Sequence, residues 1–591
     1  MLDKAKSMTH LCGAMCRFRV LWAVVVLAVP VAGCQEWFLR QADRQVYQVV
    51  AERQEQALGE THSPDLGPED GRLLPSGSMY DFVPHPVRAE VPEAFRTRAV
   101  AEDGPALPQT TRPAVERQVL TLQDAVAYAM RHSREFQSQK EDLYLAALAL
   151  TLERHLWTPQ FFGEVSYEYA NYGQVRDFDH AMTAIAQIGA TQRLPYGGEV
   201  TAQIINSLMR DLGARITSGE TGRMILSANI PLLRGAGKVA YESRYQAERD
   251  LIYAARRFER FRRAFLVQVA SSYFDVLAIK AGIENAQASV EALAIDRQRS
   301  EGLAATGRIL QVDVDRAQVE YLVARNDAIN AQAAYDSALD RFKLLIGMPT
   351  TQAIDAVEPD FEVVAPAVDE DVAIETGLRY RLDLLNDQDA VDDARRGVQV
   401  ARNNLLPDLD LRGSVTLDTD PNQKNSVSYN TERATWRGEV AMEIPLNRVA
   451  ERNAYRASLI DLRRAERSYD RRRDEVRLDV RDAFRGIEQA RLSLAIQAEN
   501  IKINDFRKRQ AEELLNRGLL SSNRDKIEAE TSWRQARNRY AQAEADYRTA
   551  VLTFLRDTGT LRVTDEGRLA SFEGADSPRS PGGPVAAGDG A

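Results

Sequence analysis

The chain has 591 residues and a mass of 66.1 kDa, with 44% hydrophobic and 27% charged residues. A mean hydropathy of −0.38 excludes a protein made mainly of membrane-spanning helices, and the hydrophobic content excludes a chain that is disordered throughout. The net charge of −10 argues against a nucleic-acid-binding protein, because binding to phosphates needs an excess of Lys and Arg.

Cysteine and histidine are confined to the first part of the chain. The positions are Cys12, Cys16, Cys34, His10, His62, His85, His132, His155 and His180. No zinc site and no Cys/His catalytic site can therefore be built from residues beyond 180. No glycine-rich phosphate loop is present either. We expect no enzymatic activity, no metal and no cofactor.

The N-terminus has the pattern of an export signal. Residues 20–33 are uncharged and follow Arg17 and Arg19. This stretch is too short to cross a bilayer, which needs about 20 residues, but a basic flank before a short apolar core is typical of a secretory signal. We therefore predict a signal peptide over 1–33, with Met15 as an alternative start.

The end of this signal resembles a bacterial lipobox. The segment Val31-Ala32-Gly33-Cys34 has the small residues that precede a lipidated cysteine. We expect Cys34 to become the acylated first residue of the mature protein. Gln35 follows it instead of Asp, which is compatible with sorting to the outer membrane. The alternative is an ordinary signal peptide followed by a chance cysteine.

Two segments are expected to be largely irregular. The lipidated N-terminal extension, 34–118, contains a short predicted helix from Trp37 to Leu58 and is then rich in Pro and Gly without periodicity. The C-terminal tail, 563–591, is predicted to be disordered for the same reason.

The sequence between these segments is duplicated. Residues 129–136 (AMRHSREF) align with 377–384 (GLRYRLDL), and Pro159 aligns with Pro407, both at a spacing of 248. Later anchors are closer together: Pro231 and Pro445 are 214 apart, Gly307 and Gly518 are 211 apart, and Gly347 and Gly559 are 212 apart. We assign a first repeat at 119–350, a linker at 351–369 and a second repeat at 370–562. The change in spacing (248 − 214 = 34) places about 34 extra residues in the first repeat.

Each repeat contains segments with strand periodicity. Apolar and polar residues alternate over 164–169, 223–230, 409–417 and 437–444, with Ile225 as an exception. In such a strand Val415 and Leu417 share one face, and Arg412 and Ser414 share the other. A soluble sandwich would also show this alternation. However, four short strands among hundreds of helical residues are better suited to a barrel wall with lipid outside and water inside.

The remaining segments predict long helices. The distances from Pro231 to Gly307 and from Pro445 to Gly518 are 76 and 73 residues, so each helix could reach about 110 Å. The return segments are only about 60 Å long. Because the helices before the strands are of similar length, one long helix matches two short helices stacked end to end. We predict a hollow helical tube with strands at one end. Four strands per chain cannot close a pore alone, which implies a homo-oligomer.

Over residues 119–562 this order of elements resembles the TolC-like outer membrane efflux family, also called outer membrane factors, in its lipoprotein form. The resemblance rests on the duplicated halves, the glycine-plus-acid turns and the strand-flanking Pro159, Pro231, Pro407 and Pro445. It implies a mainly α fold with a small transmembrane β part: a homotrimer, a twelve-stranded β-barrel and a twelve-helix periplasmic tunnel. It also implies two protein partners, a periplasmic adaptor and an inner-membrane transporter. The chain departs from the family pattern at 186–204, where an extra hairpin either joins the barrel or extends an external loop.

The predicted gate lies at the helical tips. Gly307 precedes Asp313 and Asp315, and the corresponding turn of the second repeat contains Gly518, Asp525 and Glu528. Glycine suits a sharp reversal, and acidic residues repeated by trimer symmetry would form rings that select cations. The alternative is that these are ordinary helix-start acids, stabilised by the positive end of the helix. The second turn has Arg524 where the family pattern has an acid, so Asp313 and Asp315 are the main candidates.

The sequence therefore predicts a lipid-anchored outer-membrane channel that conducts passively and takes its energy from an inner-membrane pump. The alternative is a periplasmic coiled-coil structural or adaptor protein without a pore.

Overall fold

The computed structural model describes residues 35–59, 61, 118–171, 180–211, 218–307, 309–359, 363–419, 429, 431–517 and 524–564. The predicted signal peptide, Cys34, Gly518 and most of the C-terminal tail lie outside these residues.

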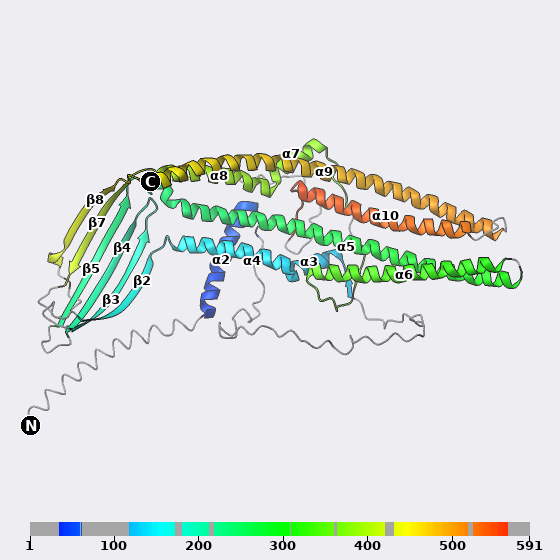
Figure 1. The fold of residues 1–591 in the computed structure, drawn as a ribbon, viewed down its shortest axis with the longest axis horizontal. Helices are drawn as coiled ribbons and strands as arrows, with labels where there is room; N and C mark the ends of the chain where they lie inside the picture. Colours follow the sequence, from blue (N-terminus) through cyan, green and yellow to red (C-terminus); the bar gives the residue numbers. More distant parts are fainter. Residues whose placement is uncertain are drawn as a thin grey trace, which may run out of the picture.

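Long helices run from one end of a sheet (Figure 1). The first part of the chain forms α2 (Gln35–Leu58), β1 (Gln118–Leu120), α3 (Leu122–His132), α4 (Arg134–His155), β2 (Gln160–Asn171), β3 (His180–Arg193), β4 (Glu199–Asp211), β5 (Ser218–Pro231), η4 (Gly237–Tyr241), α5 (Glu242–Ala305) and α6 (Gln311–Ile346). The second part forms β6 (Ile354–Ala356), α7 (Glu370–Tyr380), α8 (Leu382–Asn403), β7 (Asp408–Asp418), η5 (Thr431–Arg433), β8 (Thr435–Glu443), α9 (Val449–Asn516) and α10 (Arg524–Asp557).

The duplication is visible in the bounds of the helices. Both α3 and α7 and both α4 and α8 begin and end 248 residues apart (370 − 122 = 248, 403 − 155 = 248). The long helices α5 and α9 have 64 and 68 residues. They are shorter than the distance from Pro231 to Gly307 suggests, because residues 232–241 first form a turn and a 3-10 helix.

The short helices are stacked end to end, as the lengths predicted. Helix α6 ends at Gly347, where φ is +79°, and an added Cβ there would lie 2.1 Å from the carbonyl oxygen of His132 at the end of α3. Gly559 ends α10 beside Tyr380 at the end of α7 in the same way. Only glycine combines the left-handed backbone with so close an approach. At its other end, α3 is capped by Thr121, whose hydroxyl accepts from the Asp124 amide at 3.2 Å.

The sheet has six antiparallel strands in the order β2-β3-β4-β5-β7-β8. The expectation of four strands per chain, and with it twelve in a trimer, was therefore wrong. The extra hairpin of 186–204 lies within β3 and β4 and pairs on both sides, between β2 and β5. The strands of the two repeats meet where β5 pairs with β7, with Arg223 opposite Asp418.

The hydrophobic core follows α5, whose buried residues include Phe258, Phe265, Tyr273 and Phe274. The apolar part of this helix is long enough to cross a membrane by length and composition, but half of it is buried inside the protein, as in a core helix. The Tyr273 hydroxyl donates to the Leu120 carbonyl at 2.8 Å and fixes α5 to the two-stranded sheet of β1 and β6.

Helix α2 packs across α4 and α5. Val46 and Val50 are fully buried, and Arg53 forms an ion pair with Glu248 of α5 at 3.2 Å. The helix predicted from Trp37 to Leu58 is therefore present, and it is attached to the first repeat.

Candidate functional site

The six-stranded sheet has one apolar and one polar face. The apolar face is defined here by the residues that the cross-strand register places on the side of Leu226: Phe161, Val165, Tyr167, Tyr169, Met182, Ala184, Ala186, Ile188, Ala190, Val200, Ala202, Ile204, Leu208, Met224, Leu226, Ala228, Ile230, Leu409, Leu411, Val415, Leu417, Trp436, Val440 and Met442. Glycines and the polar residues Asn171, Gln192 and Asn206 complete it. Of the strand residues whose side chains are described, none on this face is charged.

Many side chains of the apolar face are exposed on the protomer. Phe161 is 84% exposed, Trp436 is 77% exposed and Val440 is 66% exposed. A soluble monomer rarely leaves so continuous an apolar surface in water. The face therefore needs a non-aqueous environment, and its lack of charge matches the lipid-facing side of a membrane strand.

The polar face holds the charged strand residues: Glu164, Glu168, Arg193, Glu199, Arg223, Asp408, Asp410, Arg412, Asp418, Arg437, Glu439 and Glu443. Several of them pair with each other, as Arg223 does with Asp418 at 2.7 Å. The apolar side chains here are Phe162, Ile185, Ile205 and Ile225, together with Ala441. The structure thus puts Val415 and Leu417 opposite to Arg412 and Ser414, as the alternation predicted.

The four predicted prolines lie where helices and strands exchange. Pro159 and Pro407 immediately precede β2 and β7, Pro231 is the last residue of β5, and Pro445 follows β8 by two positions. Proline has no amide hydrogen to donate to a ladder, so it suits a strand end. These positions connect the sheet to α4, α8, α5 and α9.

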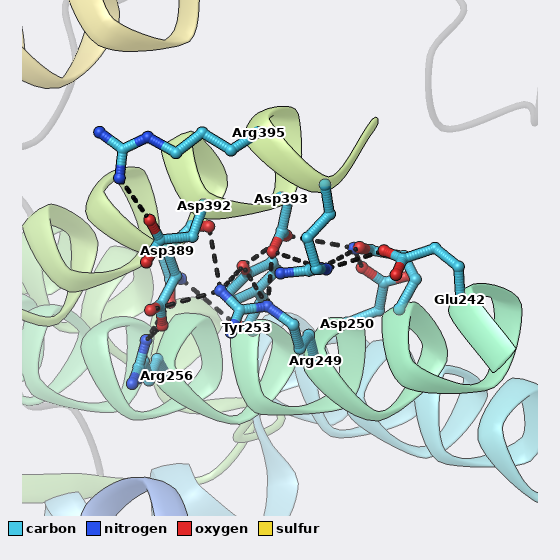
Figure 2. A network of polar contacts seen from close by, with 12 residues as sticks. Glu242, Arg249, Asp250, Tyr253, Arg256, Asp389, Asp392, Asp393 and Arg395 are labelled. Carbon is cyan, nitrogen blue, oxygen red and sulfur yellow. Dashed lines mark hydrogen bonds and ion pairs between the residues drawn. The ribbon is translucent and has the colours of Figure 1, made fainter. Parts of the chain in front are cut away.

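A polar network holds the two repeats together between α5 and α8 (Figure 2). The Arg249 side chain lies between Asp389 and Asp393, with its Nη2 3.3 Å from an oxygen of Asp389. Tyr253 donates to Asp393 at 2.6 Å, and Arg256 contacts Asp389 at 2.6 Å. Burial, and then the hydrogen bond to Asp393, raise the pKa of the Tyr253 hydroxyl, so it stays a donor at neutral pH.

A second cluster lies where α7 meets α8. Arg381 is 6% exposed and donates to Asp383 of α8 at 3.0 Å and to Asp479 of α9 at 2.7 Å. Arg260 of α5 also binds Asp383, at 2.6 Å. These residues line a cleft of about 580 Å³ that also contains Asp482. The repeat spacing puts Arg381 at the position of Ser133, so the two repeats differ here.

The tip residues of the first repeat lie at a turn between α5 and α6. Gly307 has φ of +71°, as a sharp reversal requires. Asp313 is half-buried in the first turn of α6, 3.7 Å from Arg316, and Asp315 is exposed and accepts from Gln311 at 3.2 Å. In the second repeat Asp525 and Glu528 are exposed in the first turns of α10.

The α5–α8 network and the Arg381 cluster were not predicted as sites. The available signal was the acidic run Asp387, Asp389, Asp392 and Asp393 in α8. Among the residues that the structure describes, no group of three or more His, Cys, Asp or Glu side chains is placed to hold a metal ion.

Comparisons with known proteins agree with this architecture. Residues 373–560 match the family model described as outer membrane efflux protein. Two similar solved structures are the outer membrane protein VceC from Vibrio cholerae (12% identity, 74% of this chain, 96% of that chain, TM-score 0.57) and the CmeC outer membrane channel of Campylobacter jejuni (13%, 74%, 85%, TM-score 0.57). A third is the MtrE outer membrane channel of Neisseria gonorrhoeae (14%, 74%, 88%, TM-score 0.56). No curated protein sequence matches the chain.

A two-faced sheet at one end of two repeated sets of long helices is the fold of an outer-membrane channel. The chain belongs to the outer membrane efflux protein family, whose match covers most of the second repeat.

Proposed function

We propose that this protein is the outer-membrane channel of a tripartite export system. The observation that carries the proposal is the apolar face of the sheet, which has no charged side chain among those described and continues across all six strands. Polar residues on the opposite face then line a water-filled lumen, and the helices extend this lumen into the periplasm. The chain itself performs no chemistry, and an inner-membrane transporter supplies the energy through a periplasmic adaptor.

The sheet edges support a homotrimer. The strands β2 and β8 are at the two ends of the sheet order and each pairs on one side only among the described strands. An open edge cannot be exposed to lipid, because its backbone groups would lack hydrogen bonds. With six alternating strands, β2 and β8 run in opposite directions, so β8 of one copy can pair with β2 of the next. Three copies close the ring in the trimer that the family resemblance implies.

Membrane anchoring adds a second proposal, at Cys34. The lipobox-like sequence makes this cysteine the acylated residue, and α2 follows directly from Gln35. A Cys34→Ser variant should lose incorporation of radioactive fatty acid. It should still insert, because a single lipid chain binds a membrane only marginally. Fatty-acid labelling that persists in Cys34→Ser would refute acylation at this site.

A third proposal assigns the gate to the acids at the tip. Asp315 is exposed beside the α5–α6 turn, and trimer symmetry would repeat it around the tunnel mouth with Asp313. Replacing both by Asn should lower cation selectivity and block by divalent ions. Asp340→Asn, at the other end of α6, is the control and should change neither. If the double variant conducts like the parent protein, these acids only cap the helix.

The proposal as a whole is tested by reconstitution. The purified full-length protein should form ion-conducting pores in planar bilayers and migrate as a heat-modifiable trimer. A protein that is released without detergent as a soluble rod and never conducts would instead be the periplasmic coiled-coil protein without a pore.

A further inference from the structure

The hairpin of β3 and β4 is an insertion found in one repeat only. The spacing of 248 aligns β2 with β7, and the spacing of 214 aligns β5 with β8. In the second repeat β7 pairs directly with β8, whereas in the first repeat β3 and β4 stand between β2 and β5. The insertion therefore adds two strands to the sheet and no helix to the tube.

The hairpin is paired like the strands around it. It continues the register from Gln160 opposite Thr191 on one side to Glu199 opposite Asn229 on the other. Its apolar side chains lie on the apolar face, and its polar face carries uncharged groups that bond across strands. Gln187 donates to Gln203 at 3.0 Å. An external loop would not need this alternation along its whole length.

The turn of the hairpin is fixed to the junction between sheet and helices. Tyr196 accepts through its carbonyl from the Gly237 amide at 2.8 Å. Gly198 has φ of +88°, and a Cβ there would lie 2.0 Å from the carbonyl oxygen of Asn229. On the other side Gln192 donates to the Trp157 carbonyl at 2.7 Å. The hairpin therefore spans the sheet from end to end and is held at the helical side.

We propose that the hairpin is part of the barrel wall and sets a wide pore, which admits bulky polar cargo; this inference rests on the proposed trimeric channel. Three protomers with six strands each give 18 strands, where four strands each would give 12. With strands about 4.8 Å apart and tilted by about 40°, the backbone diameters are about 36 Å and about 24 Å. Side chains of about 5 Å on each wall leave lumens of about 26 Å and about 14 Å.

The added wall also indicates the chemistry of the cargo. On the polar face the two strands contribute Thr183, Gln187, Thr191, Thr201, Gln203 and Ser207, with charges only at Arg193 and Glu199 beside the turn. Amide and hydroxyl groups hydrogen-bond to a solute without selecting its charge. The widened lumen therefore suits hydrated, bulky solutes such as flexible polymers more than small ions of one sign.

The test measures how large a reagent can enter the barrel from outside. Ser227→Cys puts a thiol on the polar face of β5, and Leu226→Cys puts one at the same depth on the apolar face. Intact outer membranes are treated with a small water-soluble maleimide and with one that carries a polymer about 20 Å across, between the two lumen estimates. The parent protein, without an added cysteine, gives the background.

Deleting residues 180–211 supplies the matched narrow channel. It removes β3 and β4 and joins β2 to β5 through 172–179 and 212–217, which is 8 + 6 = 14 residues. The loop of the second repeat, 419–434, has 16 residues, so the new connection has a natural length. We expect Ser227→Cys to react with the large reagent in the full chain at least tenfold faster than in the deletion. The small reagent should react equally in both.

The outcomes separate this inference from the proposed function. Exclusion of the large reagent from the full chain, while the small reagent reacts, would overturn the wide pore and leave the channel intact. Equal rates with the large reagent in both chains would overturn it as well. If Leu226→Cys reacts as fast as Ser227→Cys with the small reagent, the sheet is not in lipid and the proposed function fails first. If the deletion does not insert, entry of the large reagent into the full chain decides the question alone.

Discussion

Leu226 and Ser227 are neighbours on β5 that should respond in opposite ways to the same substitution. Leu226 lies on the apolar face between Ala202 and Val415, and Ser227 lies on the polar face between Thr201 and Ser414. Both are near the middle of the strand, so they share one depth in the membrane.

The magnitude follows from the two environments. An Arg facing lipid at the midplane costs about 2–4 kcal/mol, whereas an Arg in the lumen remains hydrated and costs almost nothing. Since about 1.4 kcal/mol is tenfold, Leu226→Arg should reduce the equilibrium for insertion by about 30- to 700-fold per protomer. Ser227→Arg should leave it nearly unchanged.

The assay is the fraction of protein that migrates as a heat-modifiable trimer in outer membranes, followed by unfolding in urea. Leu226→Ala controls for the lost side-chain volume and should have a smaller effect than Leu226→Arg. Equal trimer yields for Leu226→Arg and Ser227→Arg would refute a lipid-facing side of the sheet, and the alternative without a pore would gain support.

Two further predictions concern the helices. Gly347→Ala should destabilise the protein by clearly more than Gly307→Ala in thermal unfolding, because both glycines have left-handed backbones but only Gly347 is in contact with another helix end; Gly307→Ala should cost about 1 kcal/mol. Burial alone would raise the pKa of Asp383, but the hydrogen bond from Arg381 and the nearby arginine charges lower it. A lowered folded-state pKa stabilises the fold above the unfolded value of about 4 and is lost as pH falls through the folded value, so the melting-temperature gap between the parent and Asp383→Asn should narrow below about pH 4.

The sequence was sufficient for elements whose pattern is local. The alternation in 409–417 and the spacing of Pro159 and Pro407 located β7, β2 and the helix ends around them. The end-to-end stacking at Gly347 followed from lengths alone, because a helix has a fixed rise per residue. The hairpin of 186–204 was also recognisable, since its period of two is strong.

Strand order and contacts between helices were not available from local patterns. Whether 186–204 joins the sheet depends on its pairing with β2 and β5, which the hairpin sequence does not specify. The charged run in 470–482 was interpreted as a solvated face with pairs inside one helix. Arg471 does pair with Glu475 in this way, but Arg472 also binds Asp387 of α8 at 2.9 Å. A charge on a long helix looks the same in sequence whether its partner is one turn away or on a neighbouring helix.

The pairing of β5 with β7 has a consequence for the kinetics of folding. The strands β2 to β5 form a meander of near neighbours in sequence, and β7 and β8 form a separate hairpin, but Arg223 and Asp418 are 195 residues apart. Distant pairings form late, because a long loop must close first. We therefore expect two separate sheets in the periplasm, with β5 and β7 as open edges and the apolar side uncovered. Such edges invite pairing with other chains, so a newly exported protomer should depend on a holding chaperone until its two repeats have met.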